Sequence, residues 1–142
     1  MYEVKVKKAN FEPSNKDLFI LEGVSEFRRL GANEEIVFDK IAILEIHNDD
    51  ATNKDYENTV IHDINGGWLR TTSGSVAGIA NRLIDRFGNA PQFYQAYTDS
   101  KKSKKNNTNT MLTLGITAIL DEAPAGRTEN GWEVADNDLP MD

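Results

Sequence analysis

The sequence contains no cysteine among its 142 residues. Disulfide bonds and thiolate zinc sites are therefore excluded, and a reducing, cytoplasmic compartment is compatible with this composition. It also lacks any run approaching the roughly 20 apolar residues that a membrane-spanning helix needs. The first residues, MYEVKVKKANF, have no apolar core of the kind that a secretory signal contains. We therefore expect a cytoplasmic protein with one domain.

Basic residues are also in short supply, because 16 Lys and Arg stand against 23 Asp and Glu, a net charge of -7. The excess of acid is unevenly distributed. Between Asp121 and Asp142 there are seven acids and one base, so this segment carries -6 and the preceding 120 residues carry only -1. The division predicts a nearly neutral body, residues 1–120, followed by an acidic linker and flexible tail, residues 121–142.

Alternation of apolar and polar side chains predicts strands over most of the body. The patterns cover residues 2–8, 18–27, 36–47, 59–64, 68–72, 91–98 and 110–120. Gly23 lies inside the second pattern, where a glycine often marks a bend or bulge. The long apolar third pattern predicts a strand that is buried on part of both faces. Asn65-Gly66-Gly67 separates the fourth and fifth patterns and predicts a hairpin.

One helix is expected, within residues 73–88. Its apolar residues recur at offsets of 0, 3, 4, 7, 8 and 11, which is typical of one continuous stripe. Ser73 or Ser75 can cap its start, and Gly88 can end it. The fold class is thus mainly β with one helix. The order fits an OB-like five-stranded barrel (an oligonucleotide-binding fold) with added N-terminal strands. An α+β sandwich with the helix on one sheet face is the alternative.

The segment between the last two predicted strands is rich in lysine. It contains Lys101, Lys102, Lys104 and Lys105. A solvated loop kept soluble by its charge is one interpretation. The other is a flexible arm that follows phosphate groups, which suits lysine because its side chain is a mobile point charge. Aromatic rings on the preceding strand, at Phe93, Tyr94 and Tyr97, favour the second interpretation, because bases stack on such rings.

Alternation divides these rings between the two faces of their strand. Phe93 and Tyr97 share one face with Gln95, whereas Tyr94 lies on the other face. One of the two sets therefore faces the core, and the pattern alone leaves open which set that is.

Trp68 follows directly after Gly66-Gly67, where a turn makes full burial difficult. Arg70 lies two residues later and on the same face of the strand. We interpret the pair as a site for base stacking and phosphate binding. The alternative is a tryptophan that closes the end of the barrel.

Two histidines raise a further possibility. His47 with Asp49 and Asp50, and His62 with Asp63, lie at the ends of strands that can be adjacent. Histidine and carboxylates can bind a divalent metal for phosphodiester hydrolysis, but turn chemistry explains the two consecutive acids. The segment TTSGSVAG before the helix lacks the residues of a phosphate-binding loop. We therefore predict no catalytic residue, metal or cofactor.

The last residues, WEVADNDLPMD, resemble the acidic tip of bacterial single-stranded DNA-binding proteins, which ends in several Asp, an Ile or Leu, a Pro and a Phe. Asp136, Asp138, Leu139 and Pro140 match that tip, whereas Met141 replaces the Phe and Asp142 is added. More loosely, residues 68–120 resemble the strand, helix and basic hairpin of phage-encoded members: LRTTSGSVAGIANRLIDRFG, a Lys/Ser/Asn tip and MLTLGI.

The resemblance implies an oligonucleotide-binding fold that binds single-stranded DNA without sequence preference during replication or recombination. It also implies no catalysis, a tail that recruits replication or recombination proteins, and the host cytoplasm as location if a phage encodes the chain. We expect DNA contacts at Trp68, Arg70, Phe93, Tyr94, Tyr97, Lys101, Lys102, Lys104 and Lys105. Partner contacts are expected at Trp132, Asp136, Asp138, Leu139, Pro140 and Met141.

Together with Arg70, other basic residues can extend the lysine segment into a basic face, namely Lys5, Lys7, Lys8, Arg28 and Arg29. Self-association is left open. Two alternatives remain. One is a phage protein- or small-molecule-binding inhibitor of a host factor, whose tail imitates a natural partner. The other is a metal-dependent phosphodiesterase built on His47 and His62.

Overall fold

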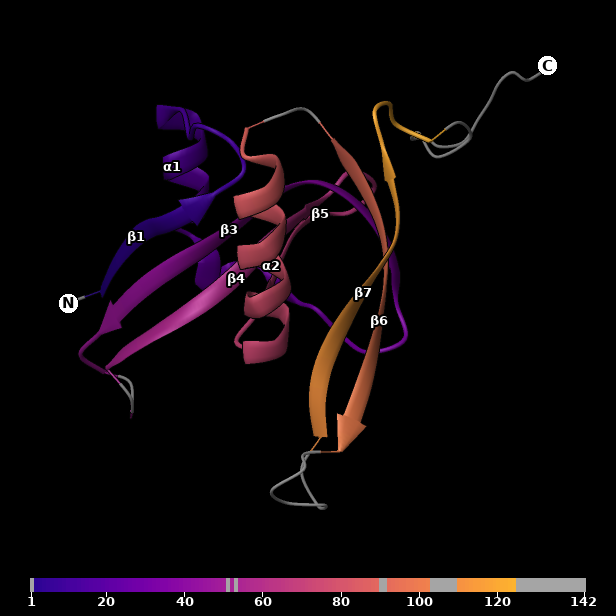
Figure 1. Ribbon diagram of the computed structural model, residues 1–142. Helices are drawn as coiled ribbons and strands as arrows, with labels where there is room; N and C mark the ends of the chain where they lie inside the picture. Colours follow the sequence, from indigo (N-terminus) through magenta and orange to yellow (C-terminus); the bar gives the residue numbers. More distant parts are fainter. Residues whose placement is uncertain (1, 51, 53, 90–91, 103–109, 125–142) are drawn as a thin grey trace.

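The computed structural model describes residues 2–50, 52, 54–89, 92–102 and 110–124, and it is mainly β with two α-helices (Figure 1). Its strands form one curled, seven-stranded sheet. The elements are β1 (Tyr2–Ala9), α1 (Asn15–Leu21), a 3-10 helix (Val24–Glu26), β2 (Arg28–Arg29), β3 (Glu35–Asn48), β4 (Asp55–Asp63), β5 (Gly67–Thr71), α2 (Gly74–Phe87), β6 (Phe93–Lys102) and β7 (Thr110–Leu120). The mainly β prediction is thus confirmed.

β3 is the central strand of the sheet, because it pairs with three strands, whereas each of the other described strands pairs with one or two. Along one edge it pairs antiparallel with β4 from Phe38 to His47. The other edge is shared, since residues 35–38 pair with β6 and residues 42–48 pair with β1. The sheet therefore forks beside the middle of β3. Its order is β2-β5-β4-β3-β6-β7, with β1 as the second branch on β3.

Asn10 fills this fork. Its buried side chain donates to the carbonyl of Asp39 at 3.0 Å and accepts from the amide of Ile41 at 2.9 Å. Its own backbone N–H donates to the Ile41 carbonyl at 3.1 Å. These bonds satisfy the β3 backbone at the point where it passes from one partner strand to the other, as buried peptide groups require.

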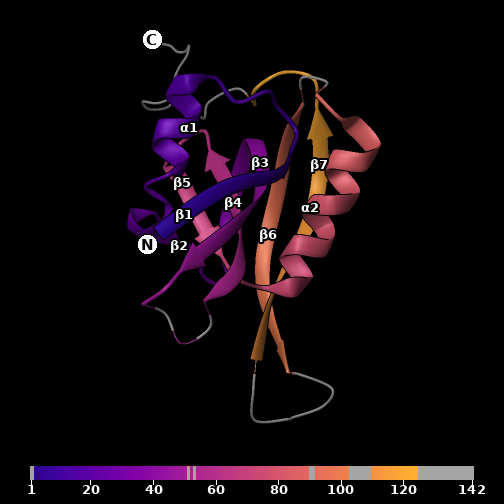
Figure 2. The ribbon, with the colours of Figure 1, turned by 90° about the vertical axis from the view of Figure 1, so that its left-hand side faces the viewer.

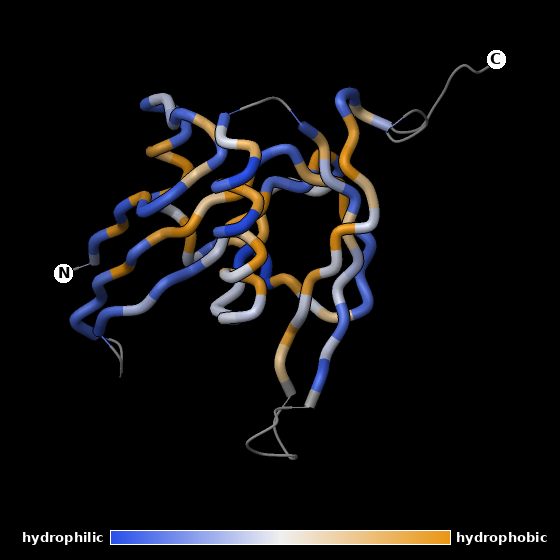
Figure 3. The backbone as a smooth tube through the Cα atoms, in the orientation of Figure 1, coloured by the Kyte–Doolittle hydropathy of each residue, from blue (hydrophilic) through white to orange (hydrophobic). Residues whose placement is uncertain are grey.

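One face of the sheet packs against α2. Ile41, Ile43 and Ile61 from the strands meet Val76 and Ala80 of the helix, and all five side chains are at most 1% exposed. The helix presents the apolar stripe that its sequence predicts. Apolar stretches converge between α2 and the strands, whereas hydrophilic stretches lie at the far end of β3 and β4 (Figure 3).

The N-terminal segment covers the opposite face of β3 and β4. Leu21 of α1 and Val24 of the 3-10 helix are fully buried against Leu44 and Val60. This second apolar cluster confirms that β3 is buried on both faces along part of its length, as its continuous apolar run predicts.

The strand predicted for residues 18–27 is wrong, because the segment forms α1 and the 3-10 helix instead. Ser14 caps α1: its hydroxyl accepts from the Asp17 amide, and the Asp17 carboxylate accepts from the Ser14 amide. This reciprocal capping box fixes a helical start. Gly23 accordingly lies between two helices rather than in a bent strand.

α2 agrees closely with its prediction. Ser73 is the N-cap, and Gly88 takes a φ of 58° at the C-terminal end, a conformation that favours glycine. The Ser73 hydroxyl also donates to the Leu112 carbonyl at 2.7 Å, which ties the start of α2 to β7. Neither helix in the described part of the chain is long and apolar enough to cross a membrane.

The two long hairpins point toward the same side of the molecule. The end of β3 and start of β4 lie at the lower left of Figures 1 and 2, and the end of β6 and start of β7 lie at the bottom. Pairing within the second hairpin continues from Phe93 and Leu120 to Lys102 and Thr110. We call this projecting pair of strands the β6–β7 arm.

Candidate nucleic-acid interface

The outer face of the β6–β7 arm carries the exposed ring that stacking requires. Phe93, Gln95, Tyr97 and Lys101 lie on this face, because strand residues alternate between faces. Tyr97 is 41% exposed, Lys101 is exposed, and Phe93 and Gln95 are half-buried. The arm therefore places an aromatic and a basic side chain on one surface, four residues apart.

The surroundings of Tyr97 hold its ring in place without covering it. Its hydroxyl donates to Oδ1 of Asn33 at 3.2 Å, and Asn33 has a φ of 61° in the turn before β3. On the neighbouring strand, Tyr97 pairs with Gly115, which has no side chain to lie beside the ring. Sequence reasoning did not identify Asn33 or Gly115 as part of this surface, because both depend on strand register.

Tyr94 belongs to the core, which answers the question that alternation leaves open. Its side chain is fully buried, and its ring lies 5.0 Å from Phe38 and 5.9 Å from Phe87, between ring centroids. Its expected DNA contact is therefore corrected, since a buried ring cannot stack on a base. Burial raises the pKa of the Tyr94 phenol.

Trp68 and Arg70 do share a face, but the N-terminal segment covers it. The Trp68 ring is half-buried and stacks on Phe27, with centroids 5.8 Å apart, and it lies 6.2 Å from Phe11 and 5.2 Å from His62. Nε of Arg70 donates to the Phe27 carbonyl at 3.0 Å. Packing beneath the N-terminal segment covers part of both side chains, which leaves less of them for the base stacking and phosphate binding that the sequence predicts.

The remaining predicted contacts are only partly described. Lys101 and Lys102 end β6. Lys104 and Lys105 lie outside the described residues, as do all predicted partner contacts: Trp132, Asp136, Asp138, Leu139, Pro140 and Met141.

Several bases outside the arm are paired locally and do not form a continuous basic face. Lys7 pairs with Glu57 at 2.6 Å and Lys8 with Asp85 at 2.5 Å. Arg28 pairs with Glu34 at 2.8 Å, and this hydrogen bond holds the pKa of Glu34 below its usual range. The predicted basic face is therefore interrupted by acidic side chains at Lys7, Lys8 and Arg28.

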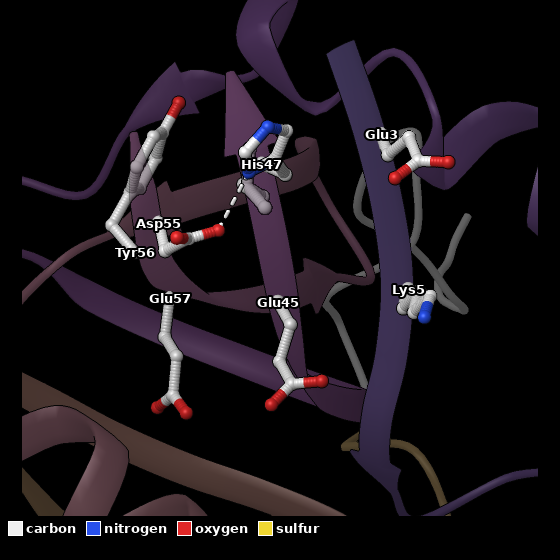
Figure 4. A pocket seen from close by; sticks show the side chains of 8 residues that line it. Glu3, Lys5, Glu45, His47, Asp55, Tyr56 and Glu57 are labelled. Atoms are coloured by element: carbon white, nitrogen blue, oxygen red, sulfur yellow. Dashed lines mark hydrogen bonds and ion pairs between the residues drawn. The ribbon is translucent and has the colours of Figure 1, made fainter. Parts of the chain in front are cut away.

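A groove of about 590 Å³ crosses the far end of β1, β3 and β4. Four of the eight residues that line it are acidic, and they lie around Lys5 and His47 (Figure 4). Nδ1 of His47 lies 2.7 Å from Asp55 and Nε2 lies 2.8 Å from Asp49, so both ring nitrogens face carboxylate oxygens. Hydrogen bonds to Asp55 and Asp49 raise the pKa of His47. This groove is unfavourable for a phosphate backbone.

The two histidines do not share a site. His47 lies in the row of Asp55, on the face that further along carries Ile61, whereas His62 contacts Trp68 on the opposite face. Nδ1 of His62 is 2.8 Å from Oδ1 of Asp39. Among the described residues, no group of three or more acidic, His or Cys side chains is arranged to hold a metal ion.

Comparison with known proteins adds no relative from which a role can be taken. No protein-family model matches the chain, and neither a curated protein nor a solved structure matches it significantly.

Proposed function

We propose that the chain binds single-stranded DNA without sequence preference, as a non-enzymatic protein of replication or recombination. The β6–β7 arm stacks on bases of the strand and neutralises its phosphates. The observation that carries the proposal is the exposed Tyr97 ring on the same face as Lys101. Stacking on an aromatic ring and pairing of phosphates with lysine are the two interactions that such binding uses.

The topology supports an OB-like barrel. β3, β4 and β5 form an antiparallel meander, and after α2 the chain returns so that β6 pairs with the other edge of β3. The spatial order β6-β3-β4-β5 is that of a Greek key, in which the fourth strand lies beside the first. β7 completes five strands, with the helix between the third and fourth, as in an oligonucleotide-binding barrel.

The face that typically binds nucleic acid in barrels of this kind is covered in this chain. Such barrels bind along the face of their second and third strands, between two hairpin loops. Here the corresponding outer face of β4 and β5 is covered by the N-terminal segment, including Phe27 and Leu21. We therefore place the DNA on the outer face of the β6–β7 arm.

The test is a titration of a fluorescently labelled oligo-dT, followed by anisotropy at several salt concentrations. Tyr97→Ala should weaken binding by roughly 1–3 kcal/mol, the usual contribution of one stacked base. Tyr2→Ala is the matched control, because Tyr2 is 39% exposed but lies on β1. Equal affinities for the wild type and Tyr97→Ala would remove the arm as the binding surface. Absence of binding at low salt would overturn the proposal.

α1 favours the alternative, a protein-binding inhibitor of a host factor. Leu18, Phe19 and Ile20 are consecutive and exposed, Phe19 by 78%. Runs of exposed apolar residues are typical of surfaces that a partner covers. A protein that does not bind oligo-dT at low salt would leave this alternative as the better one.

A further inference from the structure

The groove between α2 and β7 is an apolar surface that nothing in the described chain covers. It has a volume of about 860 Å³, and Leu83, Phe87, Leu114, Ile116 and Ile119 lie along its floor. Ile119 pairs across the arm with the buried Tyr94 and so points to the same inner face, yet it is 43% exposed. An inward-pointing isoleucine with this exposure marks a position in the core that is left open.

The helical rim of this groove is basic. Arg82 and Arg86 are four residues apart on α2, so they lie on the same side of the helix. Asp85 is beside them, but its carboxylate pairs with Lys8 at 2.5 Å. No ion pair joins Arg82 or Arg86 to an acid among the described residues. The groove thus combines an apolar floor with two arginines.

We propose that the C-terminal segment of this same chain, residues 125–142, docks in the α2–β7 groove. Five of its residues are acidic and one is basic, which complements the arginine rim. Its apolar residues, which include Trp132, Leu139 and Met141, suit the floor. The proposal concerns contacts within one molecule and does not depend on DNA binding.

The position of the segment makes this docking local. β7 ends at Leu120, directly after Ile119 in the groove, and α2 and β7 lie side by side in Figures 1 and 2. Eighteen residues reach up to about 60 Å when extended, whereas the 14 residues of α2 span about 21 Å. The segment can therefore turn back along the groove, and its tether gives it a high effective concentration there.

The absence of cysteine allows a direct test on the full chain. Asn137→Cys carries a nitroxide spin label, and methyl NMR signals report which residues the label approaches. Ile79, Ile116 and Ile119 should lose intensity, whereas Ile46 in the other apolar cluster should keep it. Uniform loss, or no loss at the groove, would overturn the proposal.

Two controls make the result specific. Arg82→Glu with Arg86→Glu should restore the groove signals, whereas Lys16→Glu with Arg29→Glu, the same change of charge at other exposed positions, should not. Mixing spin-labelled chains with unlabelled, isotope-enriched chains tests the source. In this mixture the observed chains carry no spin label, so loss of their groove signals can come only from another molecule. Such loss would show docking of a second copy instead and would overturn the proposal. Groove signals that stay broadened in the Arg82→Glu/Arg86→Glu chain would also count against it.

Discussion

The buried hydroxyl of Tyr94 leads to a prediction about stability. The Tyr94 side chain is fully buried, and the hydroxyl makes no well-formed hydrogen bond among the described residues. Burial raises the pKa of this phenol, and the nearby Asn10 side chain offsets only part of that rise. An unsatisfied buried hydroxyl costs about 1–3 kcal/mol. Tyr94→Phe should therefore raise the free energy of unfolding, by about 1 kcal/mol. Denaturant unfolding measures it.

Tyr97→Phe is the matched control for this prediction. The Tyr97 hydroxyl is hydrogen-bonded to Asn33, so removing it should leave stability unchanged or lower it by up to about 1 kcal/mol. A loss of stability in Tyr94→Phe as large as that in Tyr97→Phe would contradict the claim that the Tyr94 hydroxyl is unsatisfied.

His47 makes stability depend on pH. Its pKa is raised from 6.5 because it donates hydrogen bonds to Asp55 and Asp49. A raised pKa in the folded state means that the folded chain binds the proton more tightly than the unfolded chain. The stabilisation is therefore complete below about pH 6.5 and is lost as the pH rises through the raised value. Its size is modest, because the imidazole is partly exposed to solvent, which screens its interaction with the carboxylates.

We expect His47→Gln to lower the urea midpoint below about pH 6.5 and to have no effect once the pH exceeds the pKa of folded His47. Unfolding at a series of pH values, with an NMR titration of His47, measures both quantities. A difference between the two proteins that grows as the pH rises would show that the sign is wrong.

Elements with a clear period were predictable from the sequence, and α1 was not. β1, β3 to β7 and α2 follow alternation, an apolar run or a helical stripe, and each is present near its predicted position, whereas the two-residue β2 was not predicted. Leu18-Phe19-Ile20-Leu21 is a short apolar run, for which periodicity does not separate a helix from a strand. The missed signal was the pair Ser14 and Asp17, spaced as in a capping box.

The start of α2 leads to a prediction about how helices and strands are joined. The sequence left Ser73 and Ser75 as alternative caps of this helix. Ser73 accepts from the Val76 amide at 3.3 Å and donates to the Leu112 carbonyl at 2.7 Å. Ser73→Ala should cost about 2 kcal/mol, from the lost cap and the lost bond to β7. Ser75→Ala should change stability by no more than about 0.5 kcal/mol. Equal effects in denaturant unfolding would show that Ser73 does not connect the two elements.

The candidate site was only partly predictable, because the whole molecule decides which faces are covered. Alternation separated Tyr94 from Tyr97, and the structure then places Tyr94 in the core. No local pattern indicates that residues after β1 return across the outer face of β4 and β5 and pack on Trp68. That contact joins segments about 40 residues or more apart in the chain, for which one sequence contains no periodic signal.

The uneven charge of the whole chain leads to the last prediction. Residues 131–142 contain four acids and no base, whereas the described part of the β6–β7 arm ends in Lys101 and Lys102. Acids tethered to the same molecule lower the affinity of its bases for phosphate, and salt screens the effect. Deleting Gly131–Asp142 should therefore tighten binding to oligo-dT, most at low salt.

A full-length chain with the four acids replaced by amides separates the effect of charge from the effect of the segment's bulk. Its substitutions are Glu133→Gln, Asp136→Asn, Asp138→Asn and Asp142→Asn. If charge alone acts, this chain binds as tightly as the deleted one, because both lose the same negative charge near the arm. If the segment opposes DNA binding by its bulk instead, the amide chain should bind no more tightly than the unchanged full-length chain. Because acid–arginine pairing helps to hold the segment in the α2–β7 groove, the amide chain should also lose less signal at the groove in the spin-label experiment. Unchanged anisotropy curves for both chains at low salt would show that the acidic segment does not oppose DNA binding.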